Sequence, residues 1–227
     1  MFKPQRLKID VSEAIGTVSG LLILPEDAFA LLVLGHGAGA GMEHSFMEDL
    51  AQRLAGRKVG TLRYNFAYME HGGGPDRPPK AHAVIRAALK TASKYAEGRT
   101  LLAGGKSFGG RMTSQVAAAG ELTGVKGVVY YGFPLHPAGK PGTDRAAHLP
   151  DIRIPQLFLQ GTRDTLADFD LITSVCGQLK NAELVRIESG DHSFKTLKSS
   201  GMSQEDTMEL LAKETADFAK RIEVGKV

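Results

Sequence analysis

The segment Gly105-Lys106-Ser107-Phe108-Gly109 matches the pattern G-x-S-x-G. This pattern is typical of a sharp turn from a strand into a helix, where glycines leave room for an exposed serine hydroxyl. The neighbouring sequence fits such a turn, because the apolar run Leu101 to Ala103 precedes it and a helical stretch, Arg111 to Ala119, follows it. Ser107 is therefore a candidate nucleophile.

Two other structures are compatible with part of this segment. A glycine-rich turn in which Ser107 only caps the following helix requires no chemistry. A phosphate-binding loop, G-x-x-x-x-G-K-[ST], would require glycine at position 100, where the chain has Thr100, so this alternative fails. The first alternative has to be weighed against the other residues that nucleophilic chemistry needs.

A serine hydroxyl is a weak nucleophile at neutral pH, so it needs an imidazole to remove its proton and a carboxylate to orient the imidazole. With a G-x-S-x-G turn, the acid and then the base follow the serine in the chain, each just after a strand. Asp164 follows the apolar run Gln156 to Gln160, and His192 follows the run Glu183 to Glu188. Asp164 and His192 are therefore the predicted acid and base, although an aspartate after a strand is also a common turn former.

The remaining acids and histidines lack the required order or position. Asp168 and Asp170 are alternative acids, but they lie inside the next predicted helix. The histidines outside the glycine-rich loops lie on predicted helices or precede the acid in the chain: His44, His82, His136 and His148. Only His192 meets both requirements.

Acyl transfer to a serine also needs two N–H donors for the oxyanion, one from the residue after the serine and one from the loop after the third strand. Phe108 supplies the first. Two glycine-rich loops, Gly35 to Ala40 and His71 to Gly74, compete for the second. Because two strands precede the run Ala30 to Leu34, the loop after that run is the better placed. We assign the second donor to Ala38 and expect the other loop at the rim of the pocket.

The loop Gly35 to Ala40 also satisfies G-x-G-x-x-G/A, a dinucleotide-binding pattern. The acid expected for the ribose at the end of the next strand is missing, since Arg63 stands there. An NADP-binding oxidoreductase is therefore a disfavoured alternative. We expect His36 to hold the geometry of this loop.

Each of these residues has to follow directly after a strand of one sheet. Apolar runs alternate with stretches of helical period, which predicts an α/β domain with a mostly parallel sheet and helices on both faces. The first two runs are joined by a turn at Gly16 and predict an antiparallel pair at one edge. The predicted strands are Arg6 to Val11, Thr17 to Leu24, Ala30 to Leu34, Val59 to Asn65, Thr100 to Ala103, Val125 to Tyr131, Gln156 to Gln160 and Glu183 to Glu188.

Helical periodicity indicates which segments cover the sheet as helices, and one long segment lacks it. Phe46, Leu50 and Leu54 recur every four residues, and Glu205 to Ile222 predicts a C-terminal helix over the sheet. The segment Gly132 to Pro155 is rich in proline and has no clear helical period. We therefore expect no lid domain and an open site.

Composition favours one soluble domain over residues 1–227, with 42% hydrophobic and 23% charged residues. A net charge of +3, with basic residues scattered among acidic ones, gives no case for nucleic acid or a membrane as partner. The single cysteine, Cys176, has no disulfide partner, and no cluster has metal-binding spacing. Because the first residues lack an apolar signal region, we expect a cytoplasmic protein. We also expect no metal and no cofactor.

Four ordered motifs, GHGAG, GGKSFGG, LQGTRD and GDHSF, resemble the small α/β-hydrolase superfamily near the dienelactone-hydrolase-like proteins. The resemblance is greatest to the branch that includes a chromatin-complex subunit and uncharacterised bacterial relatives. It implies Ser107 as nucleophile, Asp164 as orienting acid, His192 as base, and Ala38 and Phe108 as oxyanion donors. Dienelactone hydrolases proper carry cysteine in the turn where this chain has serine.

The expected function is a serine hydrolase that cleaves small carboxylic esters, or thioesters, through an acyl-enzyme. An interaction protein on a hydrolase scaffold is the alternative from another class, because fold alone does not determine function. The intact set of Ser107, Asp164 and His192 favours the enzyme.

Overall fold

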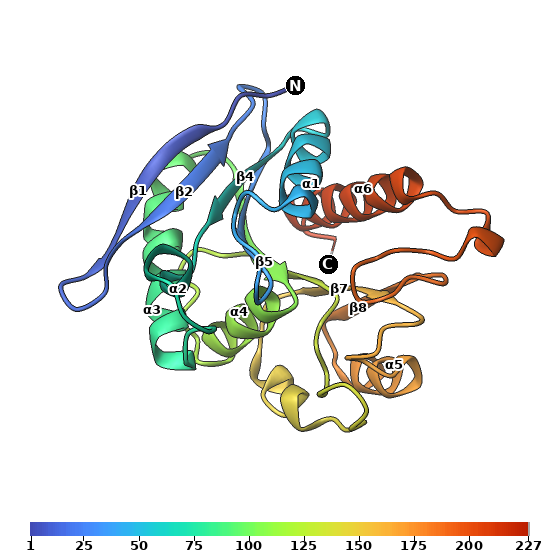
Figure 1. Cartoon of the computed structure of the whole chain (residues 1–227). Coiled ribbons are helices and arrows are strands. Elements are labelled where there is room, and N and C mark those ends of the chain that lie inside the picture. The colour runs from blue at the N-terminus through green and yellow to red at the C-terminus, as the bar shows by residue number, and fades with distance from the viewer. Residues whose placement is uncertain (227) are drawn as a thin grey trace.

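A computed structural model of the chain describes residues 1–226. One eight-stranded sheet with the order β1-β2-β4-β3-β5-β6-β7-β8 runs through the molecule (Figure 1). The strands are β1 (Gln5–Ser12), β2 (Gly16–Ile23), β3 (Ala30–Gly35), β4 (Val59–Tyr64), β5 (Thr100–Lys106), β6 (Gly127–Tyr131), β7 (Gln156–Gly161) and β8 (Ala182–Ile187). β2 is antiparallel to both β1 and β4, and the other pairs are parallel. The predicted α/β-hydrolase fold, with a mostly parallel sheet and an antiparallel edge pair, is confirmed.

β5 extends beyond its predicted end at Ala103 as far as Lys106. Glycines usually weaken a strand, but here neighbouring backbone comes too close for a side chain. A Cβ atom on Gly104 would lie 2.1 Å from the carbonyl oxygen of Val129 on β6. The extension carries the chain to the edge of the sheet, directly before Ser107.

Helices cover both faces of the sheet, as predicted. They are α1 (Ser45–Gly56), α2 (Ala67–His71), α3 (Pro78–Ala92), α4 (Phe108–Ala118), α5 (Phe169–Gln178) and α6 (Gln204–Glu223). Successive side chains of a strand point to opposite faces. On β3, Leu32 and Leu34 therefore belong to the apolar cluster that also holds residues of α1 and α6, and Leu31 and Val33 belong to the cluster that holds residues of α3, α4 and α5. The fold thus contains two apolar layers, one on each face of the sheet.

The segment Gly132 to Pro155 forms no lid helix in the described chain. It contains two short 3-10 turns, η2 (Asp144–Ala146) and η3 (Leu149–Asp151). Leu135, Leu149 and Ile152 anchor the segment, because their side chains are buried in the same core as α4. The expected absence of a full lid domain is confirmed for residues 1–226.

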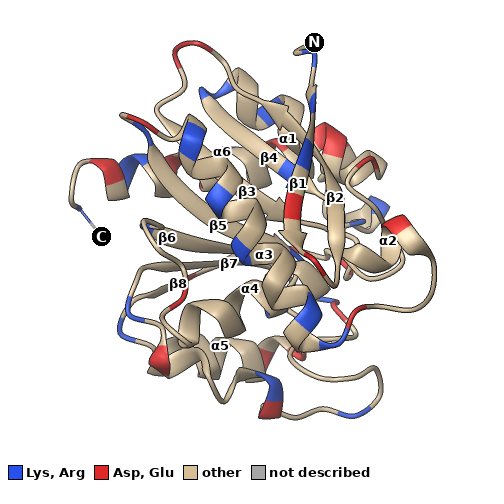
Figure 2. Ribbon diagram, turned by 90° about the vertical axis from the view of Figure 1, so that its left-hand side faces the viewer, with Lys and Arg blue, Asp and Glu red and all other residues tan. Residues whose placement is uncertain are grey.

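Charged residues of both signs are spread over the helices and outer loops (Figure 2). Within residues 1–226, no helix combines the length and the apolar character that crossing a membrane requires. Cys176 is buried on α5, 5% exposed, and burial raises the pKa of its thiol to about 12. Cys176 is therefore a small core residue.

Candidate active site

Ser107 lies in the tight turn between β5 and α4. Its backbone has φ 49° and ψ −111°, a conformation that a residue with a side chain rarely adopts. The turn is fixed at both ends, because the Ser107 N–H donates to the Tyr131 carbonyl at 3.1 Å and the Ser107 carbonyl accepts from the Arg111 N–H at 2.9 Å. The strain therefore persists because the surrounding backbone determines the conformation.

The glycines around Ser107 have a steric function. A Cβ atom on Gly105 would lie 2.6 Å from the carbonyl carbon of Gly109. A Cβ atom on Gly109 would lie 2.4 Å from the carbonyl oxygen of Gly35 at the end of β3. The first turn of α4 thus packs directly on two strand ends, as the G-x-S-x-G pattern predicts.

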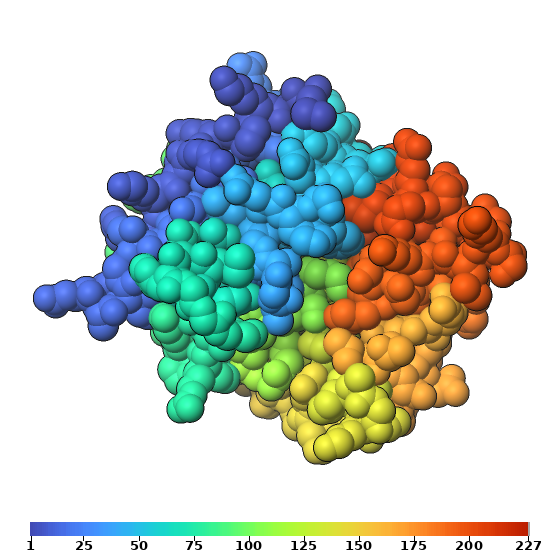
Figure 3. Space-filling model, viewed as in Figure 1, coloured from blue at the N-terminus to red at the C-terminus, as the bar shows by residue number. Residues whose placement is uncertain are grey.

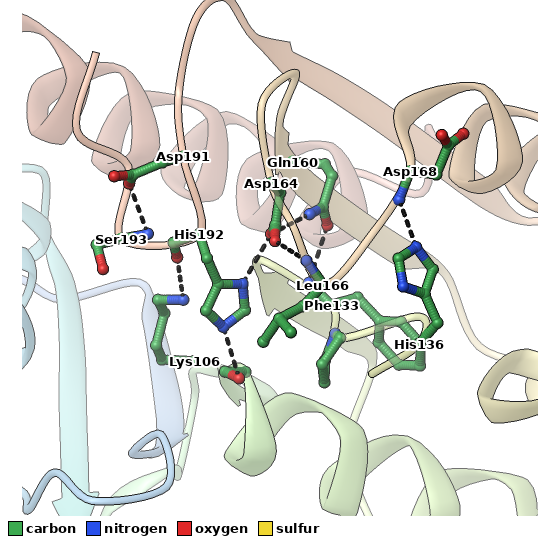
Figure 4. Close-up of polar contacts among 12 residues, drawn as sticks. Lys106, Phe133, His136, Gln160, Asp164, Leu166, Asp168, Asp191, His192 and Ser193 are labelled. Atoms are coloured by element: carbon green, nitrogen blue, oxygen red, sulfur yellow. Dashed lines mark hydrogen bonds and ion pairs between the residues drawn. The ribbon is translucent and has the colours of Figure 1, made fainter. Parts of the chain in front are cut away.

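The structure brings the three predicted catalytic residues into one chain of hydrogen bonds (Figure 4). His192 Nδ1 lies 2.8 Å from Asp164 Oδ2, and His192 Nε2 lies 2.8 Å from Ser107 Oγ. An ionised carboxylate only accepts, so Nδ1 carries the proton of a neutral imidazole. Nε2 is then the acceptor for the Ser107 hydroxyl, which is the arrangement a general base requires.

Asp164 is held by groups that the sequence analysis did not identify. Its side chain is fully buried, whereas that of His192 is 23% exposed. Oδ2 also accepts from Gln160 Nε2 at 2.6 Å, and Oδ1 accepts from the Leu166 N–H at 2.8 Å. The Gln160 amide is oriented in turn by the Phe133 N–H, which donates to its Oε1. A buried amide four residues before the acid was the available signal for this contact.

The loop that carries His192 is folded around Asp191. Asp191 Oδ1 accepts from the N–H groups of Ser193 and Lys195, at 2.8 and 2.9 Å. The chain therefore turns at His192 (Figure 4), and Nε2 of its ring lies within hydrogen-bond distance of Ser107 Oγ. Asp191 is a turn residue, and its side chain organises the loop that carries His192.

The two predicted oxyanion donors flank Ser107. Phe108 begins α4, where the first N–H groups have no partner within the helix. The Gly37 carbonyl accepts hydrogen bonds from His36 Nδ1 at 2.8 Å and from the Tyr68 hydroxyl at 3.4 Å. Because N–H and C=O of one peptide point in opposite directions, the Ala38 N–H points away from these groups. A Cβ atom on Gly37 would lie 3.7 Å from the Ser107 Cβ, so this loop adjoins the serine.

The other candidate residues lie elsewhere. Asp168 caps α5 and accepts from the N–H groups of Asp170 and Leu171. Its own N–H donates to His136 Nε2 at 2.8 Å, which ties the segment after β6 to the loop after β7. His82 contacts Gln115, and His148 Nε2 lies 2.7 Å from the Ser114 hydroxyl. None of these groups takes part in the contacts of His192.

A cleft of about 740 Å³ opens beside Ser107. In Figure 3 the light-blue segment before α1, the green turn and the orange-red segment after β8 meet on one face of the molecule. The cleft is lined by Gly37, Ala38, Ala40, His44, Ser45, Phe46, Met47, Asp49, Lys106, Ser107, Leu166, His192, Ser193, Lys195, Gln204 and Met208. It therefore lies between the starts of α1 and α6.

This position differs from the sequence-based expectation. The loop His71 to Gly74 was expected at the rim, but no residue of this loop lines the cleft in the described chain. The reason lies in its anchoring, since the Tyr68 N–H donates to Asp76 Oδ2 and the Tyr68 ring is buried beneath the Gly37 loop. The glycines between them are exposed.

Two observations bear on the alternative site chemistries. A dinucleotide-binding fold has a parallel sheet with the strand order 3-2-1-4-5-6. Here the order is β1-β2-β4-β3-β5-β6-β7-β8, and the strand next to β4 on its outer side, β2, is antiparallel to it. Arg63, at the position of the missing acid, is buried and donates to the Met42 carbonyl at 3.1 Å. Residues 1–226 contain no group of three or more potential metal ligands.

Comparisons with known proteins agree with this fold. The chain matches the alpha/beta hydrolase domain family over residues 28–220. It is similar in structure to the esterase domain of a Rhodothermus marinus protein, with a TM-score of 0.73, 18% identity and coverage of 96% of this chain and 98% of that one. It is also similar to dienelactone hydrolase from Anabaena variabilis, with a TM-score of 0.70, 19% identity and coverage of 94% and 96%. A Xanthomonas campestris serine hydrolase described as lacking a lid has a TM-score of 0.67, 20% identity and coverage of 93% and 94%.

Proposed function

Because the chain belongs to the alpha/beta hydrolase domain family, we propose that it is a serine-dependent esterase acting on small carboxylic esters. The observation that carries this proposal is the hydrogen-bonded chain from Ser107 through His192 to the buried Asp164. A single Ser–His contact would be weaker support, because Ser114 and His148 also form one. The difference is the carboxylate that fixes the tautomer of His192.

The proposed reaction begins when Ser107 Oγ attacks the ester carbonyl carbon and transfers its proton to His192 Nε2. Asp164 stabilises the imidazolium that forms. The oxyanion of the tetrahedral intermediate accepts hydrogen bonds from the N–H groups of Ala38 and Phe108. His192 then protonates the departing alkoxide, which leaves an acyl group on Ser107.

Water completes the cycle by the same steps. His192 removes a proton from a water molecule as the water oxygen attacks the acyl carbon. The second tetrahedral intermediate then breaks its bond to Ser107 Oγ, which takes the proton back from His192, and the carboxylic acid is released. The exposed edge of His192 faces the cleft, so water reaches this position. Thioesters follow the same scheme with a thiolate as the leaving group.

The cleft supports small substrates. The lining includes the apolar residues Phe46, Met47 and Met208, and the segment Gly132 to Pro155 contributes no residue to it within the described chain. Since this segment packs into the core, an acyl chain has only a short apolar surface to occupy. Similar structures include an esterase domain and a dienelactone hydrolase, which favours carboxylic esters among the substrates of this chemistry.

The test is hydrolysis of p-nitrophenyl acetate by the wild type and by Ser107→Ala. We expect kcat/KM to fall at least about a thousandfold, with an unchanged melting temperature. Ser114→Ala is the matched control, because it removes the hydroxyl of the other Ser–His contact and should keep activity within about twofold. Equal rates for wild type and Ser107→Ala would contradict the assignment and favour a non-catalytic scaffold.

A further inference from the structure

Lys106 connects the turn that carries Ser107 with the loop that carries His192. It is the last residue of β5, and its Nζ donates a hydrogen bond to the His192 carbonyl oxygen at 2.5 Å (Figure 4). The residue directly before the proposed nucleophile thus binds the main chain of the proposed base.

An aromatic ring completes the binding site of this amine. Lys106 Nζ lies over the ring of Phe194, 5.2 Å from its centroid. Phe194 is buried and stacks on Phe46 at a centroid distance of 5.8 Å, so its ring is itself fixed. A carbonyl oxygen and the face of an aromatic ring both attract a positive charge. The ammonium form is therefore the form that holds the loop.

The space for the amine depends on Gly132, which follows β6. A Cβ atom at Gly132 would lie 3.1 Å from Lys106 Nζ, 3.5 Å from the His192 carbonyl oxygen and 3.6 Å from Asp164 Oδ2. These three groups therefore surround one glycine. Four segments distant in the sequence meet here, and the hydrogen bond of the amine joins two of them, the end of β5 and the loop of His192.

Stability alone gives no reason for a cation at this position. Among the ion pairs within residues 1–226, none includes Lys106. Burial lowers the pKa of Lys106 to about 8, and the carboxylates of Asp164 and Asp191 only partly oppose this effect. An apolar side chain would avoid the cost of burying a charge.

We propose that Lys106 is a positioning residue, whose ammonium group holds the His192 carbonyl so that the imidazole stays between Ser107 and Asp164. The inference rests on the proposed function, since it assigns a task within that site. The hydrogen bonds of the imidazole orient the ring, but the place of the ring depends on the loop backbone. A displacement of about 1 Å in such a site costs about a hundredfold in rate.

The pH dependence separates this task from a purely structural one. The charged or titratable groups that face the amine or share its cleft are Asp164, Asp191, His192, Lys195, Asp49 and His44. As pH rises through about 8, Lys106 loses its charge, so kcat should fall. Stability should change in the opposite direction. The unfolded chain, with a lysine pKa of about 10.4, binds more protons than the folded one in this range, so the free energy of unfolding rises with pH.

The experiment measures kcat and KM for p-nitrophenyl acetate between pH 6 and pH 9.5 in the wild type, Lys106→Met, Lys106→Arg and the control Lys126→Met. Lys126 is an exposed lysine just before β6. We expect Lys106→Met to lower kcat about tenfold to a hundredfold at pH 7, to change KM less than about threefold, and to lose the alkaline decline. Lys106→Arg should recover part of kcat, also without the decline, because arginine stays charged. Lys126→Met should match the wild type.

Two results would overturn the proposal. One is Lys106→Met with wild-type kcat and the same alkaline decline; the other is a loss of kcat accompanied by a lower melting temperature and no recovery in Lys106→Arg. If Lys106→Met does not fold, the decline decides, since it must be present in the wild type and absent from Lys106→Arg.

A structural comparison keeps this inference separate from the proposed function. If the wild type shows no turnover and no labelling of Ser107, the proposed function fails. Crystal structures of wild type and Lys106→Met then test the tether alone. A His192 ring displaced from Ser107 in the variant supports it, and an unmoved ring contradicts it.

Discussion

The two loops that join histidine to glycine, Gly35 to Ala40 and His71 to Gly74, are alike in letters but lie in opposite surroundings. His36 is fully buried, and a Cβ atom on Gly35 would lie 2.8 Å from the Tyr64 hydroxyl. His71 is exposed, and a Cβ atom on Gly72, Gly73 or Gly74 would have no neighbour within 4 Å.

The difference shows that the place of a loop in the topology decides its task. β3 lies beside β5 in the sheet, so the loop after β3 emerges next to the turn at Ser107. The second loop follows α2, a helix of five residues beyond the end of β4, and reaches solvent. Counting strands therefore identified the loop next to the serine, although the letters of the other loop are closer to a lipase oxyanion motif.

The largest expected effect comes from placing a side chain where the first loop contacts the turn that carries Ser107. Gly109→Val places a branched side chain 2.4 Å or less from the Gly35 carbonyl oxygen. We expect a loss of more than about 3 kcal/mol in the free energy of unfolding, measured by urea denaturation. Gly74→Val is the matched control in the open loop and should melt like the wild type. A stable and active Gly109→Val protein would contradict the close packing.

The next largest effect is the difference in stability between variants of the two loop histidines, His36 and His71. His36 Nδ1 donates to the Gly37 carbonyl, and Nε2 accepts from the Phe66 N–H at 3.1 Å. His36→Ala leaves this N–H unsatisfied and creates a cavity, so we expect a loss of about 2–4 kcal/mol. His71→Ala should stay within about 0.5 kcal/mol. Similar denaturation midpoints for the two variants would remove the distinction between the loops.

The buried loop should also make stability depend on pH. Burial lowers the pKa of His36 below its ordinary value, as it does for His82 and His148. The unfolded chain therefore binds protons first as pH falls below about 6.5, and the free energy of unfolding decreases. His36→Gln should flatten this slope by up to about 1.4 kcal/mol per pH unit. An unchanged slope between pH 7 and pH 5 would argue against a neutral, buried His36.

The smallest effect concerns substrate length and the exposed loop. If His71 to Gly74 does not close over the cleft, further methylene groups remain in water and gain little of the about 0.8 kcal/mol that burial provides. In a p-nitrophenyl ester series from acetate to decanoate, kcat/KM should peak at short acyl groups and show no activation by micelles. An optimum at long chains would indicate that this loop, or the segment Gly132 to Pro155, folds over the substrate.

Much of this site was predictable because it follows from strand ends. Ser107, Asp164 and His192 each come just after a strand of a parallel sheet, and the carboxyl ends of such strands meet at one edge. Periodicity located the strands, and their order in the chain supplied the roles. The contact at Gly109 was likewise implied by its residue type.

The remaining features depend on side-chain packing between distant segments. Nothing in the spacing shows that Gln160 turns its amide toward Asp164, or that Lys106 reaches a carbonyl 86 residues further along the chain. The walls of the cleft were also mislocated. Loop sequence does not show that Tyr68 is buried, nor that the starts of α1 and α6 lie beside Ser107.

The central claim is that Ser107 is a nucleophile activated by His192 and oriented through Asp164. Its most direct test is labelling with a fluorophosphonate at pH 7, followed by mass spectrometry of the modified peptide. We expect one label per chain on the peptide that contains Ser107, no label in Ser107→Ala, and labelling slowed at least about a hundredfold in His192→Ala. A wild-type protein that stays unlabelled, or a label on another residue, would contradict the account.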